Sequence, residues 1–335
     1  MSTVSRITNL VGMGRTQFAL KLLDNAIWPI LLLTFIAFSI LVPQIFSSTD
    51  NIQFILFTSA PLGVLVLAEG LCLISGNFDL SIASIAGFSA MFTALFMTEW
   101  FPGVNPFIAI LVCILIGGII GLMNGFMIGY VGVNPFLQTL VFLIVFRELI
   151  PILSTLSISD FPETYTYLGG GEFAGIPAAI FVLLGCFLLI WFILKYTQWG
   201  MAVYAVGGNE RSAEEAGIDA SRIVLSVFAI SGMLSGLAGL LFTGYLGAVT
   251  VNLADGQVFT AFAGAVIGGI SIFGGRGNIL GALGGVLLLS TIQAGLVMMA
   301  IPSQWVKVIN GLILGIAVLL YTARAGLRER VLSMS

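Results

Sequence analysis

A few acid and amide side chains interrupt the long apolar runs of this sequence, and they are the groups that could bind a polar solute there. Glu69 is the clearest case, because a carboxyl group inside an apolar segment is costly and rarely faces lipid. It is expected to face a cavity or a partner; the alternative is a protonated, hydrogen-bonded acid that only supports the fold. The amides of Asn77, Asn124, Asn134 and Gln138 can each donate and accept hydrogen bonds. These five side chains are our candidates for a polar path between apolar segments.

Local roles compete with this interpretation. Asn134 precedes a proline and would cap the helix that follows. Asn124 lies beside a row of glycines, where an interhelical hydrogen bond is the alternative. Asp79 and Ser81 come directly before an apolar run, so they are expected to cap its helix rather than to line a path.

Residues 207–218, called the polar segment below, are the one place where the chain turns briefly polar between two apolar runs. Asn209 is a good N-cap residue, and Glu210 falls in the first turn, where the helix dipole favours an anion. Arg211 and Glu215 can pair across one turn. The segment therefore predicts a short helix.

Small residues recur along this predicted helix. Ala213, Ala216, Gly217 and Ala220 stand at i, i+3, i+4 and i+7, which predicts one smooth face of small side chains. Another protein could approach such a face closely. A solvated helix without a partner is equally compatible with the spacing.

The elements that position these residues must be membrane helices. Apolar types make up 59% of the 335 residues and charged types 8%, and the mean hydropathy is strongly positive. The apolar runs approach the roughly 20 residues that a helix needs to cross a bilayer. A barrel would show alternating runs of about ten instead. The predicted fold is an all-α polytopic membrane protein.

Ten candidate spans follow from apolar runs bounded by charge, Gly, Pro or Asn. They lie near residues 27–46, 52–74, 82–98, 106–128, 134–153, 176–195, 223–245, 258–273, 278–300 and 304–322. The eighth is short and rich in glycine, so a partial or tilted helix is expected there.

The basic residues predict the orientation, because they are retained on the cytoplasmic side. With both termini inside, every Lys and Arg except Arg147 and Lys307 falls in the cytoplasm. Residues 1–26 then form a cytoplasmic N-terminal segment, 197–222 a cytoplasmic loop and 323–335 a cytoplasmic tail of one transmembrane domain spanning residues 1–335. The longest outer loop, 154–175, is a plausible landing surface for a soluble protein.

Several classes of function are disfavoured. No CxxC or HExxH spacing occurs, so neither a metal nor another cofactor is expected. The formal charge of −3 and the absence of His argue against nucleic acid as a partner. Cys72, Cys113 and Cys186 all fall in apolar runs, which disfavours disulfides. The first 23 residues hold no long apolar stretch, so the first span is expected to stay as an anchor rather than to be cleaved.

Small residues at four-residue spacing predict close helix packing, since lipid supplies little hydrophobic drive between helices. The rows are Gly117, Gly121 and Gly125; Ser231, Ser235 and Gly239; Gly264 and Gly268; Gly277, Gly281 and Gly285; Gly311 and Gly315. One tightly packed bundle is expected, and a subunit interface is the alternative for any single row.

Four motifs resemble those of a known family in order and spacing. They are Gly-Asn-Phe-Asp-Leu-Ser (76–81), Val-Asn-Pro-Phe-Leu-Gln-Thr-Leu (133–140), the polar segment, and Gly-Gly-Ile-Ser-Ile-Phe-Gly-Gly-Arg-Gly-Asn (268–278). From about residue 55 to 322 the chain is similar to the ribose-type ABC sugar permeases, in the superfamily that also holds nucleoside and branched-chain amino-acid permeases. Two details depart from the family pattern: Asn77-Phe78 stands for Gly-Ile, and Glu69 for a neutral residue.

The resemblance implies a subunit that imports a monosaccharide or similar small polar solute across the cell membrane. Implied partners are two ABC ATPase subunits, an extracytoplasmic solute-binding protein and a second permease copy or homologous permease. The polar segment resembles the coupling helix that inserts into the ATPase, with these residues at the contact: Asn209, Glu210, Ala213, Ala216, Gly217 and Ile218. The chain itself holds no GxxxxGK[ST] phosphate loop, so it is not expected to be an enzyme.

Other interpretations remain open at this stage. Within the superfamily, the solute could be a nucleoside or a branched-chain amino acid. A proton- or ion-coupled secondary transporter with Glu69 as the coupling acid would be expected to show discontinuous spans in paired repeats, and we find none in the sequence. A membrane-embedded enzyme is disfavoured by the lack of His and of any clustered acid, thiol or metal set.

Arg147 and Glu148 are expected to form an ion pair or to snorkel, with docking of a binding protein as the alternative.

Overall fold

A computed structural model describes residues 26–319 apart from residues 44, 303, 307 and 317. Seven helices of this part are long and apolar enough to cross a membrane: α3 (Thr49–Ile74), α4 (Ile82–Leu95) with its π-helical end η1 (Phe96–Trp100), α5 (Pro106–Gly129), α6 (Pro135–Leu153), α8 (Ala178–Tyr196), α11 (Ala220–Leu246) and α13 (Ile279–Met298). Each coincides with a predicted span. The helical, polytopic architecture predicted from hydropathy is confirmed.

The other three predicted spans form shorter apolar helices: α2 (Ile27–Leu41), α12 (Gln257–Ile267) and a helix over Gln304–Ile316. At about 1.5 Å per residue, the 11 residues of α12 extend about 16 Å. A bilayer core is about 30 Å thick, so α12 reaches only about halfway across one.

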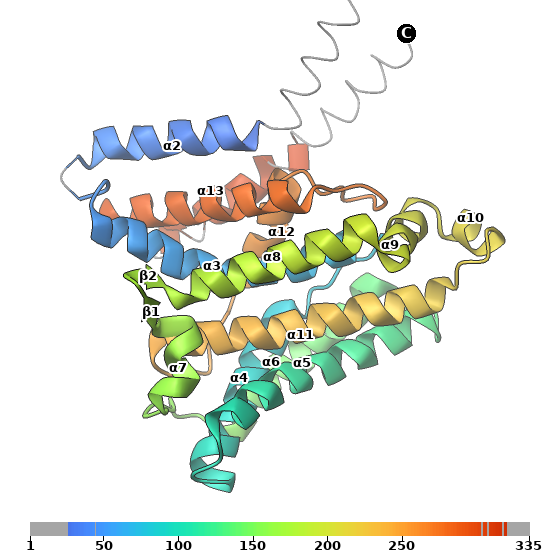
Figure 1. Ribbon diagram of the computed structural model, residues 1–335, viewed down its shortest axis with the longest axis horizontal. Coiled ribbons are helices and arrows are strands. Elements are labelled where there is room, and N and C mark those ends of the chain that lie inside the picture. The colour runs from blue at the N-terminus through green and yellow to red at the C-terminus, as the bar shows by residue number, and fades with distance from the viewer. Residues whose placement is uncertain (1–25, 44, 303, 307, 317, 320–335) are drawn as a thin grey trace, which may run out of the picture.

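The centre of the bundle is α3, in which every residue from 59 to 74 is buried. A helix that is apolar on all sides belongs inside a protein rather than at its surface. Figure 1 shows α3, α8 and α11 in the middle, with α2 and α13 along one edge and α4, α5 and α6 along the other. The outer helices α5, α6 and α8 expose many large apolar side chains, as lipid-facing helices do.

The predicted glycine rows bring helix backbones into contact. Gly117 and Gly121 of α5 lie against Gly232 of α11, where a Cβ atom on any of the three would overlap backbone atoms of the other helix. Two glycines of α13 make a similar contact: a Cβ atom on Gly285 would overlap the carbonyl oxygen of Gly264 in α12, and one on Gly281 would overlap that of Gly268 at the end of α12. The close helix packing expected at these glycines is confirmed.

The last row behaves differently. A Cβ atom on Gly311 or on Gly315 would meet no atom within 4 Å among the described residues. This row therefore does not pack within the described part of the chain.

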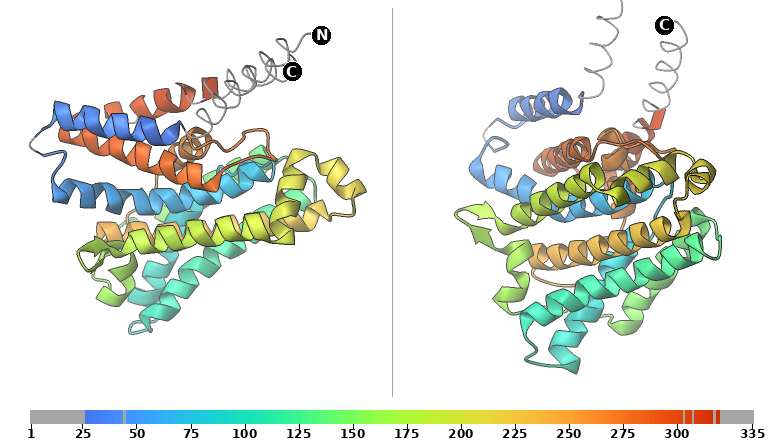
Figure 2. Two further views of the ribbon diagram at one scale, coloured as in Figure 1. Left: turned by 45° about the horizontal axis from the view of Figure 1, so that its top comes forward. Right: turned by 45° about the vertical axis from the view of Figure 1, so that its right-hand side comes forward.

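The two ends of the long helices carry different structures (Figure 1). At one end lie α7 (Glu163–Gly170) and a two-stranded antiparallel hairpin of β1 (Glu172–Phe173) and β2 (Ile176–Pro177). At the other lie α9 (Gln198–Gly208) and α10 (Glu210–Glu215), which project from the bundle (Figure 2). Both predicted long loops, 154–175 and 197–222, thus contain helices.

Some predictions fall outside the described residues. These are the N-terminal segment up to residue 25, the tail at 323–335, the end of the last span, and the basic residues Arg6, Arg15, Lys21, Lys307, Arg324, Arg328 and Arg330.

Candidate functional site

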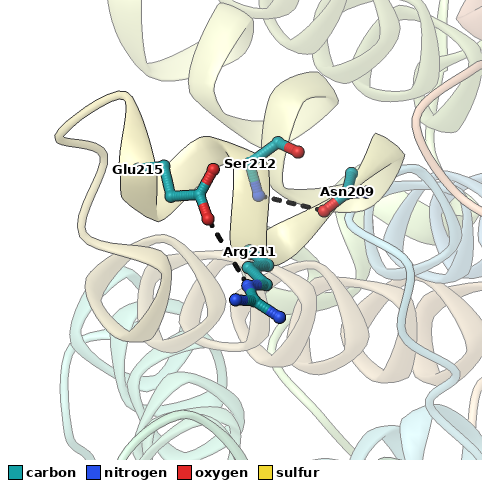
Figure 3. A network of polar contacts seen from close by, with 4 residues as sticks. All are labelled: Asn209, Arg211, Ser212 and Glu215. Atoms are coloured by element: carbon teal, nitrogen blue, oxygen red, sulfur yellow. Dashed lines mark hydrogen bonds and ion pairs between the residues drawn. The ribbon is translucent and has the colours of Figure 1, made fainter.

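The polar segment forms the short helix that its sequence predicts. The side chain of Asn209 caps α10 by accepting a hydrogen bond from the backbone N–H of Ser212 at 2.9 Å. Arg211 and Glu215 form the expected ion pair across one turn, at 3.4 Å (Figure 3). Because both side chains are largely exposed, this pair contributes little to stability.

A Schellman motif ends α10. The N–H of Ile218 donates to the Ala213 carbonyl at 3.0 Å, and the N–H of Gly217 donates to the Glu214 carbonyl at 2.8 Å. Gly217 has a φ of +85°, which glycine adopts without strain. Gly217 is therefore needed for the backbone conformation of the turn, and not to keep the surface free of side chains.

The predicted face of small side chains is wrong. Ala213 in α10 and Ala220 at the start of α11 are 4% and 2% exposed and pack into the main core, so Ala213 holds α10 against its own bundle. Among the four small residues only Ala216 and Gly217 are exposed. A helix this short, at the end of a bundle, stays in place only by burying its apolar side. The surface of α10 that remains exposed to a partner is mostly polar.

Behind α10, three backbone segments meet at glycines, here called the glycine junction: Gly76, Gly207, Gly274 and Gly275. The N–H of Gly275 donates to the carbonyl of Ile74 at the end of α3, at 2.9 Å. A Cβ atom on Gly207, in α9, would overlap that same carbonyl, and one on Gly274 would overlap the Gly207 backbone. Three of the four sequence motifs therefore meet here in direct backbone contact.

The remaining motif, 133–140, reaches the same region through a buried polar network of Asp79, Ser81, Asn124, Gln138 and Ser231. Asp79 accepts hydrogen bonds from the hydroxyls of Ser81 and, at 3.3 Å, of Ser231 in α11. The amide of Asn124, in α5, donates to Ser81 Oγ at 2.9 Å. Gln138 Nε2, in α6, donates to Asn124 Oδ1 at 3.4 Å. The network joins α5, α6 and α11 to the start of α4.

The expected capping of α4 is wrong in its detail. Ser81 stands at the N-cap position, but its side chain makes no capping hydrogen bond. Its hydroxyl instead donates to Asp79 and accepts from Asn124, partners that reach it because all three side chains are buried together. Asp79 accepts the backbone N–H of Ser81 at 2.9 Å, which forms a turn just before the helix.

Two candidate path residues stand apart from this network. Asn77 donates to the carbonyl and the hydroxyl of Ser75, at 3.1 and 3.0 Å. Asn134 accepts the backbone N–H groups of Phe136 and Leu137 at 3.0 and 3.3 Å, which confirms it as the cap of α6. Both amides are engaged in local structure.

Glu69 is fully buried in α3, and neither of its carboxyl oxygens has a hydrogen-bond partner among the described residues. It was expected to face a cavity or a partner, but in this conformation its side chain is closed off from solvent and bonded to no described residue. A buried polar group without a partner costs free energy and calls for an explanation in function. Glu69 therefore stays a candidate functional residue.

Substitution of Glu69 tests this role. Glu69→Gln keeps the size and a hydrogen-bonding group, so the ATP-driven uptake that the resemblance implies is expected to persist. Glu69→Leu removes the unpartnered polar atoms, so the variant is expected to be at least as heat-stable as the wild type yet to lose most uptake. Thermal unfolding and uptake are measured on the same preparations. Full uptake by the Leu variant would show that the carboxyl group takes no part in transport.

Two cavities flank the start of α12. The first, of about 340 Å³, lies against α4 and α6 and carries Arg147 on its wall, whose Nη1 pairs with Asp255 Oδ1 at 3.0 Å. Arg147 thus forms an ion pair as expected, but its partner is Asp255 rather than Glu148. The second, of about 760 Å³, lies between α12, α13 and the helix Gln304–Ile316. Asp255 and Phe259 line both cavities.

The second cavity contains polar residues that the sequence reasoning missed: Gln257, Thr260, Gln293 and Asn310. All four fall in or at the edge of the last three predicted spans, so an amide within an apolar run was the available signal. An isolated amide in an apolar run does not by itself distinguish a solute contact from a contact between helices.

Known proteins are similar to this chain over most of its length. Residues 51–318 match the family described as "Branched-chain amino acid transport system / permease component". The D-allose transport system permease protein AlsC of Escherichia coli is 34% identical over 82% of this chain and 84% of its own. The ribose import permease protein RbsC of Bacillus subtilis is 33% identical over 84% and 87%. The fructose import permease protein FrcC of Rhizobium meliloti is 31% identical over 86% and 82%. No solved structure matches the chain significantly.

Proposed function

Because the chain belongs to the family of branched-chain amino acid transport system permease components, we propose that it is the membrane-spanning subunit of a binding-protein-dependent ABC importer. It is a multi-pass integral membrane protein. Its cargo is a monosaccharide or a similar small polar solute. The family description names branched-chain amino acids, but the similar permeases carry the names of D-allose, ribose and fructose, which favours a sugar.

The observation that carries this proposal is α10, a capped helix that projects from the end of the bundle in a chain without a phosphate-binding loop. A separate ATPase subunit would bind there, at the exposed polar side of α10 and at Ala216 and Gly217. The solute-binding protein would dock at the opposite end, over α7 and the β1–β2 hairpin. A second permease copy would complete the assembly, and Gly315, open in the described chain, is available for it.

Alternating access would then follow from the contacts behind α10. Closure of the ATPase subunits moves α10 together with α9. At the glycine junction the backbones touch without intervening side chains, so this movement passes to the end of α3 and to the link before α4. The buried polar network ties that link to α5, α6 and α11. The helices around the solute can thereby move as a set.

The proposed orientation has both termini inside and ten membrane segments, seven of full length and three shorter. Its test uses single cysteines in a variant without native cysteines. Thr164 in α7 and Glu214 in α10 are both exposed, so only the side of the membrane decides whether a cysteine there can react. With intact cells and an impermeant thiol reagent, a cysteine at Thr164 is expected to react and one at Glu214 is not. Reaction at position 214 from outside would overturn the orientation and the ATPase contact together.

The function itself is tested by solute uptake into proteoliposomes that hold the chain with its ATPase subunit and binding protein. Radiolabelled D-ribose, D-allose, D-fructose and L-leucine are supplied separately. The proposal predicts ATP-dependent accumulation of at least one of the sugars. Accumulation of leucine alone would assign the chain to the amino-acid branch of its family.

A further inference from the structure

The cavity between α12, α13 and the helix Gln304–Ile316 has the features of a solute site. Its volume of about 760 Å³ falls within the roughly 300–1,000 Å³ typical of small-molecule pockets. Its polar wall is formed by Gln257, Thr260, Gln293 and Asn310, and we call it the amide cavity. We propose that a small, uncharged, polyhydroxylated solute binds in the amide cavity during transport, with these four side chains as its hydrogen-bonding partners. This inference rests on the proposed importer function and adds the residues that contact the solute.

The first argument is free hydrogen-bonding capacity. Within the described part of the chain, the side chains of Gln257, Thr260, Gln293 and Asn310 make no hydrogen bond to other residues. Each amide offers donors and an acceptor, and the threonine hydroxyl offers both. Polar groups inside a membrane protein are costly unless something satisfies them. The hydroxyl groups of a sugar both donate and accept, so they match this set.

The buried polar network makes a useful contrast. The amides of Asn124 and Gln138 are also buried in the bundle, but they bond to each other and to Ser81. Their amides are already engaged with each other and with Ser81, and neither of the two cavities beside α12 includes them. The network positions helices, whereas the amides of the cavity remain available to a solute.

The second argument is that the polar groups lie in one layer. Helix α12 begins at Gln257, α13 ends at Met298 and the following helix begins at Gln304. These three ends share one side of the membrane, because consecutive helices cross it in opposite directions: α12 leads away from that side, α13 returns to it and the helix Gln304–Ile316 leads away again. At about 1.5 Å per residue, Thr260, Gln293 and Asn310 all lie within about 9 Å of that side. In the proposed orientation it is the outer side, where a binding protein would release its solute.

The third argument concerns charge. Asp255 is the one acid on the wall of the amide cavity, and Arg147 already pairs with it at 3.0 Å. The pair leaves the entrance close to neutral, so a cation gains little from Asp255. The rest of the wall is apolar, formed by residues such as Phe259 and Val297. An uncharged solute with hydroxyl groups and apolar C–H surfaces fits this lining.

The test compares variants that lose one hydrogen-bonding group each and keep their size. Gln293→Met and Asn310→Leu remove amides from the membrane interior, so neither is expected to impair folding. In proteoliposomes with the ATPase subunit and binding protein, each is expected to lower D-ribose or D-allose uptake about tenfold, the effect of one lost hydrogen bond. Assembly with the ATPase subunit and its basal ATP hydrolysis should stay at the wild-type level. The control is Thr58→Val, which keeps the size of the side chain and loses a hydroxyl that donates to the Phe54 carbonyl within α3, outside the cavity.

A second measurement reads the site directly. Thr260→Cys, in a variant without native cysteines, is treated with a small methanethiosulfonate reagent with and without D-ribose or D-allose. The transported sugar is expected to slow the reaction, and L-leucine is not. Wild-type uptake by both Gln293→Met and Asn310→Leu, or labelling unaffected by a sugar that is transported, would overturn the amide cavity as the solute site. If the wild-type complex transports none of the sugars, the proposed function fails instead of the proposed site. If L-leucine slows the reaction of the cysteine at position 260, the proposed class of solute is rejected.

Discussion

Replacing Ala216 by tryptophan is expected to detach the chain from its ATPase subunit while the bundle stays folded. Ala216 is exposed at the C-cap of α10, with φ −84° and ψ 4°, a conformation that other residues adopt. A groove that fits α10 closely leaves no room for an indole ring. Overfilling a packed site costs about 1–3 kcal/mol, which corresponds to a loss of roughly tenfold to more than a hundredfold in affinity. Co-purification of the ATPase with a tagged permease measures the loss, and uptake in cells should fall with it.

The control for this substitution is Thr155→Trp, which places the same large side chain at an exposed position near the opposite end of the bundle. It should leave ATPase binding unchanged. Gly217→Trp is a less clean test, because the φ of +85° at this position would strain any other residue. Normal ATPase binding and uptake by Ala216→Trp would mean that α10 is an ordinary surface helix.

Local sequence rules were sufficient for features that depend on neighbouring residues. The cap at Asn209, the ion pair of Arg211 with Glu215 and the cap at Asn134 each need only a few adjacent residues, and the structure confirms all three. The seven long spans were equally accessible, because a bilayer sets their length and composition. Close packing at Gly121 followed from the four-residue spacing of small side chains.

Features that depend on tertiary contacts could not be read in the same way. Helical spacing placed Ala213 on a small face, but it cannot tell whether that face meets a partner or the protein's own core. Ser81 has the residue type of a cap, yet its hydroxyl bonds to Asn124, which is distant in the sequence. The free amides of Gln293 and Asn310 stand in apolar runs, but this local signal is the same as that of amides that only join helices, such as Asn124. They stand out only once the helices that hold them enclose a cavity.

The source of the driving force separates an ABC importer from a proton-coupled transporter, for which the buried carboxyl group of Glu69 would be the natural coupling acid. In the importer, uptake is expected to need the separate ATPase subunit, because the chain itself holds no phosphate-binding loop. Omitting that subunit, or ATP, should reduce uptake to the background of empty vesicles. An imposed proton gradient should have no effect.

One set of proteoliposomes decides between these mechanisms when uptake of the transported sugar is followed under two conditions: ATP supplied on the ATPase side without a proton gradient, and a proton gradient without ATP. We predict accumulation in the first condition and none in the second. If the chain alone accumulated the sugar in response to the proton gradient, and ATP did not change this accumulation, the assignment of this protein as the membrane subunit of an ATP-driven importer would be contradicted.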